Sequence, residues 1–343
     1  MKSFYRAPAF IVLLYAHSLY SQTEANTQSV KFANAIIGRY QPNINKLTGA
    51  GWQYSNTIIL AGIEKVFDQV KTASYQTSYY NYIKAFVDAY VNADGTIPQS
   101  KIMTSLGLDG SHPGLACLFI YEQTKLAKYQ LAAKHIRDTL LLASIGYPKT
   151  PEGGFWHRND PVNYKNVELL DGIYMANPFL AKYGWLFNDT TATNAAVQQI
   201  IILYNHNYNS VNHLINHAFD YDKSTYPWAN PSTGVSYEVW SRGMGWFMLS
   251  LIEVLKYLPH SHPQYSQLIT MLNNLSFGIK NYQSSTNGLW YCIVDSPKTA
   301  ARNYIETSGS GMFIYTLKTA IDSGYISSAT YLPVVTKAWT GYQ

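Results

Sequence analysis

The stretch ELLDGIYMANPFLAKY, residues 168–183, decides the fold. It is too apolar for a helix with a single buried face, and a helix of this kind needs neighbours on two sides. Comparable helical patterns precede and follow it, separated by short loops that carry Gly, Pro, Asn and Asp. Strand patterns are scarce. The sequence therefore predicts an all-α fold.

Helical patterns continue along the chain on both sides of this stretch. The spacing of apolar residues predicts helices at 29–40, around 58–67 and 82–90, and at 112–126, 128–145, 168–183, 190–208, 236–258, 264–281, 306–323 and 327–340. A short hairpin is expected at 287–294. No linker divides these segments, so we expect one domain over residues 28–343, a closed (α/α) ring of helical hairpins. The alternative is an open solenoid, but no fixed-period repeat is visible.

The composition narrows the class of partner. The chain has 343 residues, a net charge of +5 and no run of basic residues, which argues against nucleic acid. A mild positive field favours an anionic substrate. The 30 Tyr and 8 Trp suit a large helical core, and they also suit clefts that bind sugar rings.

The first 21 residues are typical of an export signal. Lys2 and Arg6 precede a short apolar stretch at 7–20, and a cleavage site is expected near Ser18 or Ser21. The stretch is too short to span a bilayer, and no later segment is long and apolar enough. We therefore expect an exported protein, periplasmic or secreted, without a membrane span; the alternative is a buried N-terminal helix. Cys117 and Cys292 are too few for a disulfide framework, and a single bridge between them stays open.

Gly, Trp, His, Arg and Asp recur together where the predicted helices begin. These clusters lie at 107–114, 151–158, 168–176, 217–220 and 240–246. Catalytic and binding residues concentrate on loops that a rigid scaffold holds in place. The recurrence therefore indicates a functional site at one mouth of the ring.

Asp171 is the candidate catalytic acid. It lies in the first turn of an apolar helix, where an aspartate commonly caps the helix or interacts with its dipole. However, Leu170 and Ile173 surround it with apolar side chains, which raises the pKa of a carboxyl and allows it to act as a general acid. Asp109 is the second candidate, with helix capping as its alternative role. Two carboxyls are what glycoside chemistry usually needs.

Other candidates lie in the remaining clusters. Arg242, between Trp240 and Trp246, could grip a carboxylate while a ring stacks on the sugar, or it could be a surface arginine. His217 is either a donor to a sugar oxygen or a core histidine, and His112 and His157 are more ambiguous. The histidines lack the spacing of metal ligands, and neither a phosphate loop, nor a dinucleotide motif, nor a serine-hydrolase elbow occurs. No metal or cofactor is predicted.

Several runs together resemble a known family. They are EGGFWHR at 152–158, LDGIYMANPF at 170–179, HAFD at 217–220, WSRGMGW at 240–246 and NYIETSGS at 303–310. In this order they resemble glycoside hydrolase family 105, the unsaturated rhamnogalacturonyl hydrolases, which are related to the unsaturated glucuronyl hydrolases of family 88. The resemblance extends from about residue 30 to the end of the chain.

The resemblance implies an (α/α)6 barrel and an unusual hydrolysis. The family's substrate is an acidic oligosaccharide with a terminal 4,5-unsaturated uronic acid, which an aspartate protonates at C4 while water adds at C5. By the match, Asp171 is this acid and base, and Asp109 orients substrate or water. The match also assigns substrate-binding positions, which are His217, Trp240, Arg242, Arg158, Trp52, Tyr54 and Trp246.

The sequence departs from the family pattern in three places. Leu169 stands where the family often has Trp, and Arg158 where it often has Lys, so the substrate preference is in doubt. We also count about eleven helices where the barrel needs twelve, and therefore expect a chain truncated at its C-terminus, without the last helix. Unsaturated galacturonyl-rhamnose from pectin is the leading substrate, and unsaturated glucuronyl-rhamnose from ulvan, the substrate of an unsaturated glucuronyl hydrolase, is the second. A non-catalytic glycan-binding toroid and an ordinary glycosidase or lyase are the alternatives; a monomer or weak dimer is expected.

Overall fold

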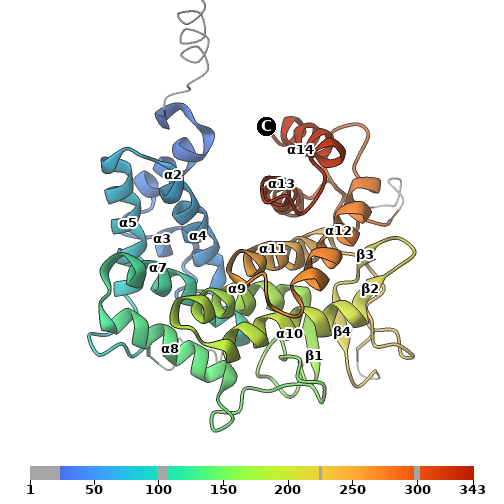
Figure 1. The fold of residues 1–343 in the computed structure, drawn as a ribbon, viewed down its shortest axis with the longest axis horizontal. Helices are drawn as coiled ribbons and strands as arrows, with labels where there is room; N and C mark the ends of the chain where they lie inside the picture. The colour runs from blue at the N-terminus through green and yellow to red at the C-terminus, as the bar shows by residue number, and fades with distance from the viewer. Residues whose placement is uncertain (1–23, 99–106, 224–225, 297–301) are drawn as a thin grey trace, which may run out of the picture.

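The computed structural model describes residues 24–98, 107–223, 226–296 and 302–343. The predicted export signal at 1–21 lies outside these residues. Within them, eleven α-helices have more than ten residues, and Figure 1 shows their order along the chain. They are α2 (Gln28–Arg39), α4 (Tyr54–Gln69), α5 (Ala73–Asp88), α7 (Gly114–Thr124), α8 (Ala127–Leu141), α9 (Leu170–Phe187), α10 (Thr190–Asn207), α11 (Ser241–Tyr257), α12 (Tyr265–Asn281), α13 (Thr307–Asp322) and α14 (Ser328–Tyr342).

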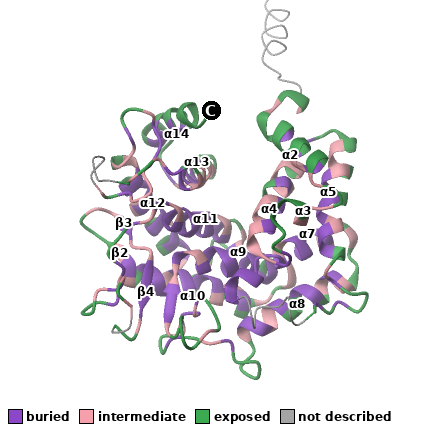
Figure 2. Cartoon of the chain, turned by 180° about the vertical axis from the view of Figure 1, so that it is seen from behind, coloured by how far each residue is buried: buried purple, intermediate pink, exposed green. Residues whose placement is uncertain are grey.

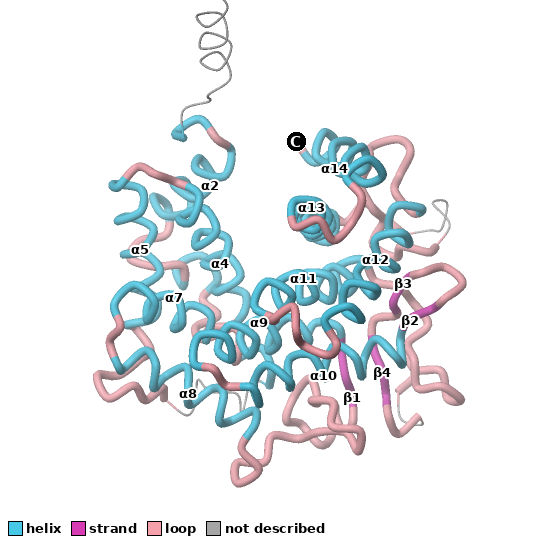
Figure 3. The backbone as a smooth tube through the Cα atoms, viewed as in Figure 1, coloured by secondary structure: helices cyan, strands magenta, loops and turns pink. Residues whose placement is uncertain are grey.

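Short elements complete the described part of the chain. The helix α3 (Asn45–Thr48) and the 3-10 turns η1 (Glu24–Asn26) and η3 (Gly107–Gly110) lie in its N-terminal third. Strands β1 (Val167–Leu169) and β4 (Ala218–Asp220) pair antiparallel, as do β2 (Tyr208–Asn209) and β3 (Leu214–Ile215). Figure 3 shows how little strand this is beside the helices. The all-α prediction is confirmed.

Ten of these helices, from α4 to α14, form five consecutive hairpins arranged in an arc, and α2 precedes them. The first helices of the hairpins pack against one another in the order α4, α7, α9, α11, α13, and each also contacts the helix that follows it. Figure 1 shows the arc, with α2 and α4 at one end and α13 and α14 at the other. Residues of α4, α13 and α14 line a cavity of about 960 Å³ between these ends. The predicted absence of a twelfth helix stays a prediction.

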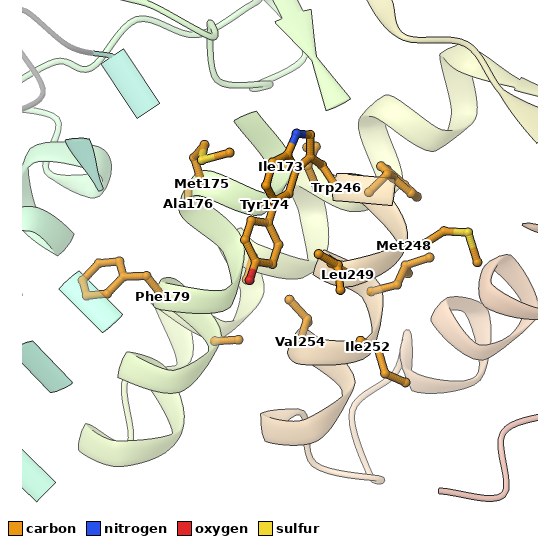
Figure 4. Close-up of a cluster of buried hydrophobic side chains, with 14 of the residues drawn as sticks. Ile173, Tyr174, Met175, Ala176, Phe179, Trp246, Met248, Leu249, Ile252 and Val254 are labelled. Carbon is orange, nitrogen blue, oxygen red and sulfur yellow. The ribbon is translucent and has the colours of Figure 1, made fainter. Parts of the chain in front are cut away.

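Helix α9 lies at the centre of the arc and is buried along almost its whole length, as the opening stretch predicts. Figure 4 shows its side chains against those of α11, with the Tyr174 and Trp246 rings 5.1 Å apart and nearly parallel. On its far side α11 approaches α13 so closely that a Cβ on Gly245 would lie 2.7 Å from the sulfur of Met312. Figure 2 shows that burial is concentrated in these central helices.

Some predicted boundaries are wrong because of pairing between distant segments. The predicted helix at 168–183 begins at residue 170, since Val167–Leu169 pairs with Ala218–Asp220. The helix predicted from 236 begins at Ser241, because Ala229 and Ser236 form a bridge before it. The hairpin at 287–294 is also wrong. There, Tyr291 pairs with Ile305 and Ile293 pairs with Trp240.

Two further expectations concern cysteines and membranes. Cys117 is buried and Cys292 is partly exposed, and neither takes part in a disulfide. Within the described ranges, none of the helices combines the length and the apolar character needed to cross a bilayer.

Candidate active site

The pairing of β1 with β4 positions Asp171. This pairing places His217, just before β4, beside Leu170, whose backbone N–H donates to the carbonyl of His217 at 3.0 Å. Asp171 follows in the first turn of α9, with its Oδ2 3.6 Å from His217 Nδ1. The two candidate residues, 46 positions apart in sequence, therefore meet at the mouth of the arc.

Two carboxyls of the site have raised pKa values. Burial raises the pKa of Asp171 to about 7, with a further increase from the charge of Asp109 that Arg242 partly offsets. Burial likewise raises the pKa of Asp109 to about 6, and Arg158, whose Nη2 lies 3.7 Å from Asp109 Oδ2, lowers it. Near neutral pH this pair can hold a proton on Asp171 while Asp109 is charged.

Tyr54 lies among the same groups. Burial raises the pKa of its phenol, the charges of Asp109 and Asp171 raise it further, and Arg242 and Arg158 lower it. The Tyr54 phenol therefore lies within the electrostatic field of all four charged groups. Tyr54 comes from the start of α4, so the site draws on both the first and the fourth hairpin.

Trp240, Arg242 and His217 pack together and form a wall of the site beside Asp171. The Arg242 guanidinium lies 4.5 Å from the centre of the Trp240 ring, and the His217 ring meets that ring edge-on at 4.9 Å. Gly243 makes this arrangement possible, because a Cβ there would lie 2.5 Å from His217 Nδ1. Burial lowers the pKa of His217 to about 4, with a smaller contribution from Arg242, so the ring is neutral at neutral pH.

Three polar atoms of this site are buried and lack a hydrogen-bond partner in the described part of the chain. They are Asp171 Oδ2, His217 Nδ1 and Arg242 Nε. Each unpaired buried polar atom costs about 1–3 kcal/mol, and folded proteins rarely place several of them together. Such a group is typical of a site whose partners belong to a ligand. Both donors and acceptors are present, as a polyhydroxylated ligand requires.

Two of the predicted substrate-binding rings are buried. Trp52 is 1% exposed; its ring stacks on Phe86, and its Nε1 donates to the carbonyl of Gly110 at 3.2 Å, beside Asp109. Trp246 is 5% exposed and packs its edge against Tyr54. Both rings support residues of the site instead of facing a sugar.

Sequence reasoning left three buried polar residues unassigned or missed. His157 and His112 are buried, and burial lowers the pKa of each to about 3, so both are neutral. The backbone of His157 links Leu108 to Val167, which places it between the two carboxyls. Glu168 was missed, although burial raises its pKa to about 8 and it accepts from Thr150 at 3.3 Å. Glu168 is followed by two leucines, and an apolar setting of this kind is the sequence feature that identified Asp171 as a candidate acid.

The described residues contain no group of three or more His, Cys, Asp and Glu that could hold a metal ion.

Carboxyls with raised pKa values, two arginines and aromatic rings at the mouth of a helical arc define a class, the helical-toroid glycoside hydrolases. Within that class, the model of Glycosyl Hydrolase Family 88 matches residues 28–342. The chain belongs to this family.

Individual relatives agree with this assignment. A solved glycoside hydrolase of family 105 from C. acetobutylicum is 29% identical, with a TM-score of 0.81 over 92% of this chain and 82% of that one. The expected (α/α)6 fold class is thereby confirmed. Protein Atu3128 of Agrobacterium fabrum is 34% identical over 110 residues, 32% of this chain and 46% of that protein. An unsaturated 3S-rhamnoglycuronyl hydrolase of Formosa agariphila is 30% identical over 100 residues, 29% of this chain and 26% of that protein.

Proposed function

We propose that this chain removes a 4,5-unsaturated uronic acid from the non-reducing end of an acidic oligosaccharide. The observation that carries the proposal is the setting of the Asp171 carboxyl, whose Oδ2 is buried without a hydrogen-bond partner in the described residues, 3.6 Å from His217 Nδ1, so that burial raises its pKa to about 7. A carboxyl that keeps its proton near neutral pH can protonate a carbon–carbon double bond and then accept a proton from water. Arg242 and Arg158, close to the carboxyl pair, supply the positive charge that the uronate needs.

The proposed reaction is a hydration followed by a collapse. Asp171 donates its proton to C4 of the vinyl ether, and positive charge develops at C5, where the ring oxygen stabilises it. Water adds at C5 and returns a proton to the Asp171 carboxylate. The hemiketal then opens, and the hemiacetal left at C1 releases the next sugar as an alcohol. In this proposal Asp109, whose charge raises the pKa of Asp171, orients the water.

The leading substrate in this proposal is unsaturated galacturonyl-rhamnose derived from pectin. A second candidate is the ulvan type, in which the rhamnose carries a sulfate. The name of the Formosa agariphila relative, an unsaturated 3S-rhamnoglycuronyl hydrolase, favours the second. Both substrates share the unsaturated uronic ring that Asp171 would protonate.

Incubation with lyase-generated oligosaccharides tests the proposal. We expect the ultraviolet absorbance of the conjugated double bond to fall as the next sugar is released. Release of saturated sugars at constant absorbance would instead identify an ordinary glycosidase, a rise in absorbance would identify a lyase, and binding without turnover would identify a glycan-binding toroid.

Asp171→Asn is the decisive variant, with an expected loss of about 10²–10⁴-fold in kcat. Asp189→Asn is the matched control, because Asp189 also lies at a helix N-terminus, where it accepts from Ala192 N at 3.0 Å and pairs with Arg137 Nε at 2.8 Å. The control should keep its activity. Turnover by folded Asp171→Asn at the wild-type rate would refute the proposed role of Asp171.

A further inference from the structure

A groove of about 760 Å³ opens beside the carboxyl pair. His217 and Trp240, which form one wall of the active site, also line this groove. Residues of β1 and β4, the magenta strands with these labels in Figure 3, also line the groove, as do Cys292 and Ile293. A volume of this size holds more than one small ring. A sugar attached to a uronic acid at Asp171 would therefore extend into it.

The groove is rich in aromatic side chains. Five of its lining residues are aromatic, namely Tyr164, Tyr226, Trp228, Tyr237 and Trp240. The rings of Tyr226 and Trp228 are nearly parallel, with their centres 5.3 Å apart. Flat apolar faces with polar edges suit the C–H faces and hydroxyls of a sugar ring.

The charge carried by the residues that line the groove is negative only. Glu238 is the only Asp, Glu, Lys or Arg among the lining residues that the structure describes. His217 adds no positive charge, because burial lowers its pKa to about 4. Two cations lie over rings of the groove, Arg242 over Trp240 and Arg158 over Tyr164, and the proposed function assigns both of them to the carboxylate of the uronic acid. The groove therefore presents a carboxylate, with no cation among its lining residues to balance an anionic group.

The position of Glu238 is tied to the active site. Its backbone carbonyl accepts from the N–H of His217 at 3.3 Å, two residues before Trp240. The side chain is exposed and lines the groove. An anion bound in the groove would therefore lie near Glu238 and lose part of its hydration without gaining a cation from the lining residues, since Arg242 and Arg158 would pair with the uronic acid.

We propose that this groove binds the leaving-side sugar and selects an uncharged one, with Glu238 as the residue that disfavours a sulfate. The inference rests on the proposed function, since it concerns the sugar next to the uronic acid at Asp171. The charge of this groove would then distinguish the substrate preference of this chain from that of an enzyme that acts next to 3-sulfated rhamnose.

Two disaccharides test the inference, an unsaturated uronyl-rhamnose and the same compound with a 3-sulfate on the rhamnose. We expect kcat/KM for the sulfated compound to be lower by about tenfold or more. Glu238→Gln should shift the ratio of the two kcat/KM values towards the sulfated compound, and Glu238→Lys should shift it further. Because the ratio is taken within each variant, a change in the amount of folded enzyme cancels.

Asp322→Asn is the matched control, since it removes an equal charge from the far end of α13. Its ratio should equal that of the wild type. Absence of turnover with both compounds would count against the proposed function itself. Equal or preferred turnover of the sulfated compound would overturn the groove's selectivity, and an unchanged ratio in both Glu238 variants would overturn the role of Glu238.

Discussion

The carboxyl of Asp171 keeps its proton near neutral pH because of where α9 begins. The strand before the helix is buried, so Asp171 enters the first turn surrounded by protein, with 22% of its side chain exposed. Burial disfavours the carboxylate more than the helix N-terminus and Arg242 favour it. The residue is thus both a favourable N-terminal charge, as its position suggests, and a buried acid.

The pH dependence of activity follows from this balance. As pH rises through about 7, Asp171 loses the proton that it must donate, so we expect kcat/KM to fall on the alkaline side with an apparent pKa near 7. In Asp109→Asn that limb should move to lower pH, because the charge of Asp109 raises the pKa of Asp171. Initial rates measured from pH 5 to 9 check both statements. An alkaline limb that moves upward in the variant would contradict them.

The same pKa predicts an effect on stability. The unfolded chain loses the Asp171 proton near pH 3.8 and the folded chain near pH 7, so between these values the folded state binds more protons and stability falls as pH rises. Asp171→Asn removes this cost. We expect the variant to be more stable than the wild type by about 2–4 kcal/mol at pH 8 and nearly equal at pH 4. Denaturant unfolding at the two pH values measures the difference, and a variant less stable at pH 8 would refute it.

At the scale of elements, α11 meets the loop before β4 at Gly243. Gly243→Ala would place a Cβ 2.5 Å from His217 Nδ1 and push that ring out of the wall of the site. We expect a loss of about 1–3 kcal/mol in stability and a lower kcat in the folded fraction. Gly62→Ala is the control, because nothing lies within 4 Å of the added Cβ on α4, and it should stabilise by about 0.5–1 kcal/mol. Melting temperatures and kcat values of the two variants test this prediction. Equal kcat values for Gly243→Ala and Gly62→Ala would contradict it.

The helices could be predicted from the sequence because their signal is local. The apolar spacing predicts 190–208 and 264–281, which the structure places at Thr190–Asn207 and Tyr265–Asn281. The errors lie where pairing is long-range. β1 has three residues and a partner about 50 positions away, and the segment around Tyr291 pairs with two different distant segments. Periodicity within a short window contains no information about such partners.

The site residues also divide into those that a local motif predicts and those whose position depends on long-range packing. Asp171, Asp109, Arg242 and His217 follow from motifs at helix starts, and the structure brings them together. The depth of Trp52 and Trp246 did not follow, since an aromatic beside a polar loop can face either the pocket or the core. Only the packing of Trp52 on Phe86, from another helix, decides that it lies in the core.

At the scale of the whole molecule, Glu253 of α11 connects both ends of the arc. Its Oε1 accepts from Lys65 of α4 at 2.6 Å and from the Tyr315 hydroxyl of α13 at 2.8 Å. Glu253→Ala should cost about 2–3 kcal/mol, less than a fully buried pair, because 35% of the Lys65 side chain is exposed. Asp322→Ala removes an exposed pair with Lys318 and should cost less than about 1 kcal/mol. Thermal unfolding of both compares them, and equal losses would show that Glu253 does not hold the arc together.

The order of the hairpins has a consequence for how the chain acquires its activity. Each first helix of a hairpin packs on the helix that follows it and on the first helices of the neighbouring hairpins, so native contacts form between near neighbours and folding can advance along the chain as it leaves the ribosome. Catalytic activity cannot be acquired in the same stepwise way. Tyr54, Asp109, Asp171 and Arg242 stand at the starts of successive hairpins, and the charges of Asp109 and Arg242 help to set the pKa of Asp171. Helix content should therefore rise early during refolding, and catalysis should return only with the fourth hairpin.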